Sequence, residues 1–309
     1  RTSYKCIVIL PMRDSTYDMY RDEPPLDTVV KDLVFRIDPP DLLKVLQARL
    51  NYIVRITNQT EDKYELDQGL SVTIRKSELI EYFKCIMHVI RNNRWISNIF
   101  YKLSDRNTRN GIQLFEDFCK SGHISSDEIF KIRVIGNEYE LPPYMFLNAL
   151  LRKNRRYYNE EQSNFVNLFH ADYRDDFPDP FVRIDILLWL KARRTKEGPA
   201  KTKGMFPASN LVKDMQIIGH NDEVTHRELN YLVKRGLVLS ETLMSSVELN
   251  DLVKITIPGL LHLTLLDNIT YLAACAEDVI FKDTATMMRI STRLASATYL
   301  SKLSVALTA

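Results

Sequence analysis

The stretch that most constrains the fold of this chain is residues 224–239. Four apolar residues recur there at the spacing of one helix face, and the opposite face is polar and basic: Val224, Leu229, Leu232 and Val233. Gly236 then supplies the left-handed conformation that commonly ends a helix, and the apolar run Leu237-Val238-Leu239 begins a strand. The stretch therefore predicts a short amphipathic helix, a glycine stop and a strand.

Further elements are predicted on both sides of this stretch. Residues 207–218 have the pattern of a helix, and residues 252–257 that of a return strand stopped by Pro258-Gly259. A first helix is expected from Pro180, and its core face is predicted to comprise Phe181, Ile184, Leu187, Leu188 and Leu190. This order resembles a winged helix-turn-helix domain, which we predict for residues 180–259.

A winged helix can read duplex DNA through its third helix. The side chains that would then face the major groove or the backbone are Thr225, Arg227, Asn230, Tyr231 and Lys234, whereas Glu228 would repel phosphate. The loop at residues 191–204 holds six basic residues and one acid, a local net charge of +5. Its candidate phosphate contacts are Arg193, Arg194, Lys201 and Lys203. Two alternatives stay open: the loop is basic only for solubility, or the third helix packs inside its own protein.

The first residues have the pattern of an α/β sheet. Residues 4–10 form a nearly continuous apolar run, as in a strand buried on both faces, and Arg13 follows at its carboxyl end. A second short strand is expected at residues 34–37, and a helix begins at Pro39-Pro40. This pattern resembles the end of an AAA+ or STAND-type ATPase core. The resemblance implies that Arg13 senses the γ-phosphate of ATP, whereas the residues alone favour a capping or ion-pairing arginine.

Helices are predicted at residues 77–90 and 95–103, after a polar connector at residues 58–74. The next helix, expected from about Asp105, resembles the lid helix of AAA+ proteins. The resemblance implies that Arg109, or alternatively Arg106, contacts the nucleotide as a second sensor. Gly111 stands where that family usually has alanine. The alternative is a solvated arginine on an ordinary bundle helix.

The sequence has no Gly-x-x-x-x-Gly-Lys-[Ser/Thr] motif and no apolar strand ending in paired acids. ATP and magnesium would therefore be bound with the help of residues outside these 309. Because Arg1 leads at once into an apolar strand, we expect the chain to be part of a longer protein. The six histidines show no ligand spacing, so no metal site is predicted.

Residues 123–179 are predicted to be a helical linker with a helix at residues 143–151. The segment Ser163–Phe169 resembles one that precedes the winged helix in STAND-like ATPases. Four aspartates after it, Asp172, Asp175, Asp176 and Asp179, are interpreted as solvated turn residues. After residue 259, an apolar helix is expected at residues 260–272 and an amphipathic one at residues 285–309.

Composition excludes several classes of protein. Hydrophobic residues make up 45% and charged residues 27%, with a net charge of +2, which is ordinary for a globular protein. The four cysteines have no paired spacing, which favours a reducing compartment such as the cytoplasm. No apolar run approaches the roughly 20 residues that cross a bilayer, so no membrane partner is expected.

The sequence therefore predicts a mainly α fold with a small amount of β-structure. The expected parts are the end of an ATPase core (1–57), a helical lid (58–122), a helical linker (123–179), a winged helix (180–259) and a helical tail (260–309). The resemblance implies a nucleotide-controlled switch that forms homo-oligomers, in antiphage defence or in loading on DNA. The alternative is a non-enzymatic winged-helix protein that binds duplex DNA.

Overall fold

The computed structural model describes residues 37–56, 61–65, 71–124, 141–172, 174–176, 178–199, 201–242 and 246–278, and the single residues 24, 285, 288, 289 and 292. The chain divides into two compact units, Arg1–Pro39 and Pro40–Ala309. The strand expected at residues 4–10 and the candidate sensor Arg13 lie outside the described residues, as does the strand expected at residues 34–37 except for Ile37. The described part is mainly helical with two small antiparallel sheets, which confirms the predicted class.

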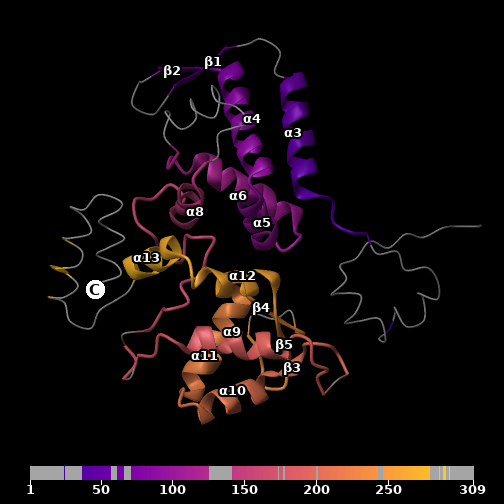
Figure 1. Ribbon diagram of the computed structural model, residues 1–309, viewed down its shortest axis with the longest axis vertical. Helices are drawn as coiled ribbons and strands as arrows, with labels where there is room; N and C mark the ends of the chain where they lie inside the picture. The colour runs from indigo at the N-terminus through magenta and orange to yellow at the C-terminus, as the bar shows by residue number, and fades with distance from the viewer. Residues whose placement is uncertain are drawn as a thin grey trace, which may run out of the picture. The chain divides into compact units, whose positions relative to one another are not determined.

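The second unit begins with a group of helices (Figure 1). They are α3 (Leu42–Ile56), α4 (Lys76–Asn92), α5 (Arg94–Leu103), α6 (Thr108–Lys120) and α8 (Pro143–Arg152). The helices predicted at residues 77–90, 95–103 and 143–151 are thus confirmed. The polar connector predicted at residues 58–74 is wrong, because β1 (Glu61–Glu65) and β2 (Ser71–Arg75) pair there as an antiparallel hairpin. Polar side chains obscured this hairpin in the sequence.

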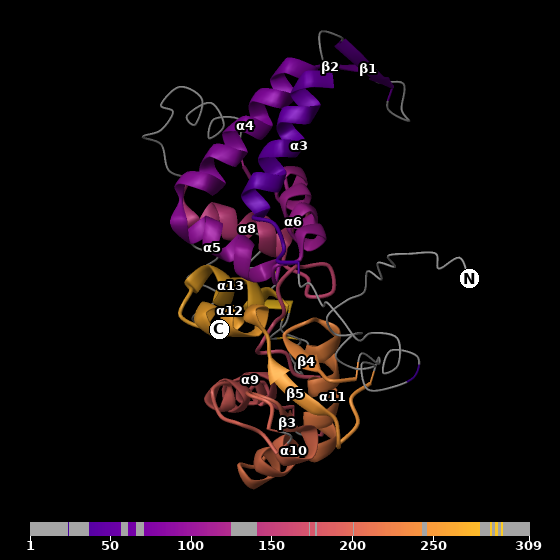
Figure 2. The ribbon, with the colours of Figure 1, turned by 90° about the vertical axis from the view of Figure 1, so that its right-hand side faces the viewer.

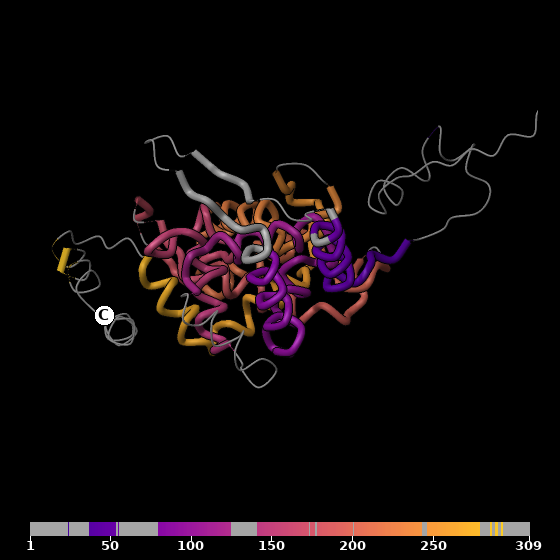
Figure 3. The backbone as a smooth tube through the Cα atoms, turned by 90° about the horizontal axis from the view of Figure 1, so that it is seen from above, coloured from indigo at the N-terminus to yellow at the C-terminus, as the bar shows by residue number. Residues whose placement is uncertain are grey.

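Aromatic packing holds this group together. The rings of Phe100, Phe118 and Phe146, from α5, α6 and α8, lie with centroids 5.0–6.3 Å apart and are almost fully buried. α3 packs against α4 and α6 within the same unit, so it groups with the helices that follow it rather than with residues 1–39. Seen from above, α3 and α4 lie next to each other (Figure 3).

Helix α6 begins later than expected. Asp105 and Arg106 both have positive φ, 48° and 59°, which no helix accommodates. The side chain of Asn107 then caps α6 by accepting hydrogen bonds from the backbone N–H groups of Arg109 and Asn110. The predicted start near Asp105 is therefore wrong by one turn.

The region predicted as a winged helix contains three helices and three short strands (Figure 2). In chain order they are α9 (Val182–Arg193), β3 (Phe206–Pro207), α10 (Ala208–Ile217), α11 (Asp222–Lys234), β4 (Val238–Ser240) and β5 (Leu252–Ile255). The strands form an antiparallel sheet in the order β3-β5-β4. Gly236, with φ of 73°, ends α11 as predicted. The predicted core face of α9 needs correction, because Phe181 and Leu188 are 54% and 43% exposed.

Two short helices follow the sheet, α12 (Ile257–Leu265) and α13 (Ile269–Glu277). The single helix expected at residues 260–272 is wrong, because Asn268 caps α13 and the two helix axes differ by 94°. Pro258 and Gly259 lie in the first turn of α12, where proline is tolerated. α12 packs on both α5 and α9, and α13 packs on α8. Within the described residues, no single helix is long and apolar enough to cross a membrane.

Candidate functional site: a buried arginine network

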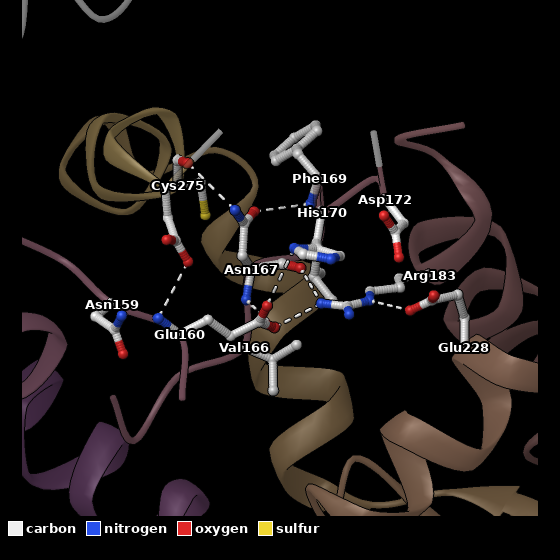
Figure 4. Close-up of polar contacts among 12 residues, drawn as sticks. Asn159, Glu160, Val166, Asn167, Phe169, His170, Asp172, Arg183, Glu228 and Cys275 are labelled. Atoms are coloured by element: carbon white, nitrogen blue, oxygen red, sulfur yellow. Dashed lines mark hydrogen bonds and ion pairs between the residues drawn. The ribbon is translucent and has the colours of Figure 1, made fainter. Parts of the chain in front are cut away.

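The guanidinium of Arg183, in the first turn of α9, is buried and forms three hydrogen bonds with other parts of the chain (Figure 4). The side chain is 3% exposed. Its Nε donates to Glu228 Oε2 of α11 at 2.7 Å, and its Nη1 donates to Glu160 Oε1 at 2.5 Å. Nη1 also donates to the backbone oxygen of Asn167 at 2.7 Å. We call Glu160, Asn167, Arg183, Glu228 and Tyr231 the Arg183 network.

Tyr231 of α11 completes the network. The Arg183 guanidinium carbon lies 4.2 Å from the centroid of the Tyr231 ring, a stacking distance for a cation over an aromatic face. Burial alone lowers the pKa of Arg183, but the charges of Glu160 and Glu228 and the hydrogen bond that Arg183 donates to Glu228 more than offset this, so the net shift is upward. The arginine therefore stays charged, and two carboxylates from different parts of the chain compensate it.

A second arginine, Arg227 on α11, extends the network to the surface. Arg227 Nε donates to Glu228 Oε1 at 3.0 Å. Its Nη1 and Nη2 donate to the two carboxylate oxygens of Asp175, at 3.0 and 2.7 Å. The hydrogen bond with Arg227 is the main reason that the pKa of Asp175 is lowered. The interpretation of Asp175 as a solvated turn residue is therefore wrong.

The chain between Tyr158 and His170 has no regular helix or strand, yet it is bonded from several sides. Glu160 Oε1 accepts from the backbone N–H of Asn167 as well as from Arg183. Arg235, after α11, donates to the backbone oxygens of Glu160 and Ser163 at 2.9 and 2.8 Å. Arg235 thereby attaches Glu160 and Ser163 to the end of α11, and Arg183 attaches Glu160 to α9.

Helices α12 and α13 bind the same segment from the other side. His262 Nε2 accepts from the Val166 N–H at 3.0 Å, while its Nδ1 lies 2.7 Å from the Pro258 oxygen and therefore carries the proton. Complete burial lowers the pKa of His262 to about 4, so the ring is neutral, as this bonding requires. The Tyr271 hydroxyl donates to the Val166 oxygen, and Asn167 Nδ2 donates to the Cys275 oxygen.

A separate ion pair joins α8 to the end of α13. Arg152 Nε and Nη2 donate to the two oxygens of Glu277 at 3.1 and 2.6 Å, and both side chains are less than a tenth exposed. Glu277 Oε2 also accepts from the backbone N–H of Tyr158. The segment from Tyr158 to His170 is therefore a packed part of the core and not a loose linker.

The DNA-facing residues predicted on α11 are mostly used within the chain. The prediction for Thr225 is wrong, because this residue is fully buried and its hydroxyl donates to the Asn221 oxygen at 2.7 Å. Asn230 Nδ2 donates to the His226 oxygen, and its Oδ1 accepts from the Val247 N–H. Tyr231 stacks on Arg183 and Arg227 pairs with Asp175, as described above. Lys234 is exposed.

The basic loop between α9 and β3 is an ordered hairpin. Glu197 and Lys203 form an antiparallel bridge, and Gly204 N–H donates to the Lys196 oxygen at 2.8 Å. Its exposed cations form no ion pair with described residues: Lys191, Arg194, Lys196, Lys201 and Lys203. Arg193 differs, because it stacks on Trp189 at 3.7 Å and pairs with Asp214 at 2.9 Å. We call residues 191–204 the basic hairpin.

The candidate sensors Arg106 and Arg109 are both exposed at the turn between α5 and α6. Because Asn107 already caps the N–H groups of Arg109 and Asn110, these two groups are not available to a phosphate there. Gly111 is buried one turn further on, and a Cβ at this position would lie 2.4 Å from Leu42 Cδ2 of α3. The departure from alanine at Gly111 therefore has a packing reason.

His220 was not singled out from the sequence but has two acidic partners. In the turn before α11, its Nδ1 lies 2.5 Å from Asp179 Oδ2 and its Nε2 lies 2.9 Å from Asp185 Oδ2. A neutral imidazole has only one N–H to donate, so both contacts require the charged ring. Burial lowers the pKa of His220, but the hydrogen bonds and charges of both carboxylates more than offset this, and the pKa is raised. Asp179 is therefore not a solvated turn residue either.

Among the described residues, no group of three or more His, Cys, Asp or Glu side chains is placed to hold a metal ion. Cys275 is buried beside the network, and burial raises the pKa of its thiol to about 12, which makes it a poor nucleophile. No protein-family model, no curated protein and no solved structure matches this chain.

Proposed function

We propose that the chain is the lid and winged-helix part of a nucleotide-controlled switch of the AAA+ or STAND type. In this proposal residues 180–259 are the winged helix, and α11 is its third helix. The order of helix, short strand, two helices and a two-stranded hairpin supports this assignment. The observation that carries the proposed function is that α11 turns Glu228 and Tyr231 inward to Arg183 and pairs Arg227 with Asp175. The third helix thereby acts as a docking unit for its own protein.

The Arg183 network suits a switch because its contacts would be lost together and not one at a time. Separating Arg183 from Glu160 and Glu228 would leave charges without partners in a dry site, which costs several kcal/mol. The contacts are therefore either all made or replaced together, as in a two-state element. A movement of the lid helices would reach this network through α12, which packs on both α5 and α9.

In the proposed switch, ATP and magnesium bind to a P-loop supplied from outside these residues, and Arg109 or Arg106 contacts the nucleotide. Arg13, the other candidate sensor, lies outside the described residues. An arginine fork suits a terminal phosphate because two N–H groups can meet two oxygens. Loss of that phosphate would release the lid helices and favour the open arrangement of the Arg183 network. The resemblance to AAA+ and STAND ATPases also implies assembly into homo-oligomers and a role in antiphage defence.

The test is to express the chain together with the coding sequence that precedes it and to measure its mass in solution with and without MgATP. We expect MgATP to change the assembly state, and we expect Arg109→Ala to weaken this response at least tenfold. Lys213→Ala, an exposed cation on α10, is the matched control and should respond like the wild type. A wild-type protein that binds no MgATP contradicts the proposal.

A second candidate function, phosphate-backbone binding to duplex DNA, is favoured by the basic hairpin. Five exposed cations that form no ion pair with described residues lie at the end of α9 or in the loop after it, and counterion release would make their binding to DNA steeply dependent on salt. The hairpin rather than α11 would carry this contact, because Arg227 is already paired with Asp175.

A salt titration of DNA binding separates the two candidates. If DNA is the partner, Lys201→Ala with Lys203→Ala should lower affinity at least tenfold and reduce the salt slope by about 2, at roughly 0.9 per phosphate contact. Arg227→Ala should change both much less. No binding at low salt excludes the DNA candidate without affecting the switch.

A further inference from the structure

A groove between α3 and α4 lies away from the Arg183 network. Its volume is about 240 Å³. Six residues of α4 line it, at spacings that place them on one helix face: Ile80, Phe83, Lys84, Met87, His88 and Arg91. The α3 side is lined by Gln47, Leu50, Asn51 and Ile53. At 1.5 Å per residue, the α4 face from Ile80 to Arg91 extends about 16 Å, or three helical turns.

The groove combines an apolar floor with a cationic edge. Leu50, Ile53, Ile80, Phe83 and Met87 form the floor. Lys84 and Arg91 are exposed along the α4 edge, with His88 between them, and none of the described residues that line the groove is a carboxylate. Neither Lys84 nor Arg91 forms an ion pair with another described residue. His88 is held by Asn92, whose Nδ2 lies 2.8 Å from its Nε2.

These features define what the groove can bind. A compact ligand needs a closed cup, commonly of 300 Å³ or more, whereas this space is smaller and elongated. A helix that lies in a groove places apolar residues at i, i+3 or i+4, and i+7 on its floor. Acidic residues beside that stripe would meet Lys84 and Arg91. We infer that the α3–α4 groove is a docking site for an acidic amphipathic helix of a partner protein.

The inference does not depend on the proposed function. Its test uses the full 309-residue chain and a fluorescent 18-residue synthetic helix with a leucine stripe flanked by glutamates. A second peptide with lysine in place of each glutamate is the control. We expect the acidic peptide to bind at least ten times more tightly than the basic one. Equal binding of the two peptides overturns the inference.

A charge reversal then tests the position of the site. Lys84→Glu with Arg91→Glu should weaken the acidic peptide at least tenfold and reverse the preference in favour of the basic peptide. Lys44→Glu with Arg49→Glu makes the same charge change on exposed α3 residues that do not line the groove, and should leave binding within twofold. Loss of binding in both double variants overturns the inference.

Hydrogen exchange gives a readout without any variant. The acidic peptide should slow amide exchange at residues 47–53 and 80–91 and leave residues 208–217 unchanged. Protection elsewhere overturns the inference. Binding of dodecanoate without binding of the peptide would also overturn it, because the ligand would then be a small amphiphile. Self-association that the peptide displaces would overturn it too, because the occupant would then be a second copy of this chain.

Discussion

Arg183 of α9 and Glu228 of α11 are joined by a 2.7 Å hydrogen bond, and their side chains are only 3% and 8% exposed. Glu160 meets the same guanidinium from a segment with no regular secondary structure. One buried cation thus joins two helices and an irregular segment that are distant in sequence. The position of α11 therefore depends on Arg183, which joins α11 to both α9 and the irregular segment.

Replacing Arg183 by methionine should be strongly destabilising. The change leaves Glu160 and Glu228 buried without a compensating charge, and breaking a buried pair in this way typically costs about 3–5 kcal/mol. The free energy of unfolding in urea measures the effect. Lys120→Ala is the matched control, because it breaks an exposed pair with Glu116 and should change the free energy of unfolding far less than Arg183→Met does.

A triple variant separates the loss of charge balance from the loss of packing. Arg183→Met combined with Glu160→Gln and Glu228→Gln removes all three charges, and it should recover much of the stability lost in Arg183→Met alone. An Arg183→Met variant as stable as Lys120→Ala would show that the network contributes little.

The Arg227–Asp175 pair should contribute in a pH-dependent way. The pKa of Asp175 is lower in the folded protein than in the unfolded chain, chiefly because of its hydrogen bond with Arg227. The contribution of ionised Asp175 to stability is therefore fully present above the pKa of the unfolded chain, about 3.9. It is lost as pH falls through the pKa of the folded protein. Since the pair is partly exposed, we expect Asp175→Asn to cost about 1 kcal/mol or less at pH 7. The cost should shrink as pH falls below the unfolded value, and a cost that does not change with pH would contradict this assignment.

Much of the helical fold could be predicted, because periodic apolar positions mark buried helix faces. The limits of α4, α5 and α11 follow from such stripes and from Gly236. The hairpin β1–β2 was missed because β1 is almost entirely polar, although the polar–apolar alternation of Ser71–Arg75 in β2 was an available signal. The break between α12 and α13 was missed because both helices are apolar, and the Asn268 cap was the available signal.

The arginine network was missed for a different reason. Its members come from α9, α11 and residues 160–167, and only tertiary packing brings them together. One signal was present in the sequence. Arg183 is spaced i, i+4 and i+7 with Leu187 and Leu190, so it belongs to the buried face of its helix. An arginine on a core face predicts a buried carboxylate partner, but no sequence rule identifies which one.

His220 should make stability fall as pH rises. Its pKa is raised in the folded protein, where burial is outweighed by hydrogen bonds with Asp179 and Asp185. The contribution of charged His220 to stability is thus complete below the pKa of the unfolded chain, about 6.5. It is lost as pH rises through the pKa of the folded protein. We expect His220→Gln to cost about 1 kcal/mol at pH 5.5 and less at pH 9. Urea midpoints across this range measure it, and an equal cost at both ends would rule out a charged His220.

Gly111→Ala should destabilise the protein although alanine favours helices. The added methyl group would lie 2.4 Å from Leu42 Cδ2, and such overpacking typically costs about 1–3 kcal/mol. A double-mutant cycle with Leu42→Ala tests the cause, because the combined loss should be smaller than the sum of the two. Strict additivity would show that the clash is not with Leu42.

The most direct test of the central claim is amide hydrogen exchange in Arg183→Met compared with the wild type. If α11 is held as a docking unit through Arg183, exchange should rise at least tenfold both in residues 158–172 and in residues 222–234. Exchange in α5 and α6 should rise much less. Unchanged exchange in residues 158–172 would contradict the claim that this network joins the segment to α11.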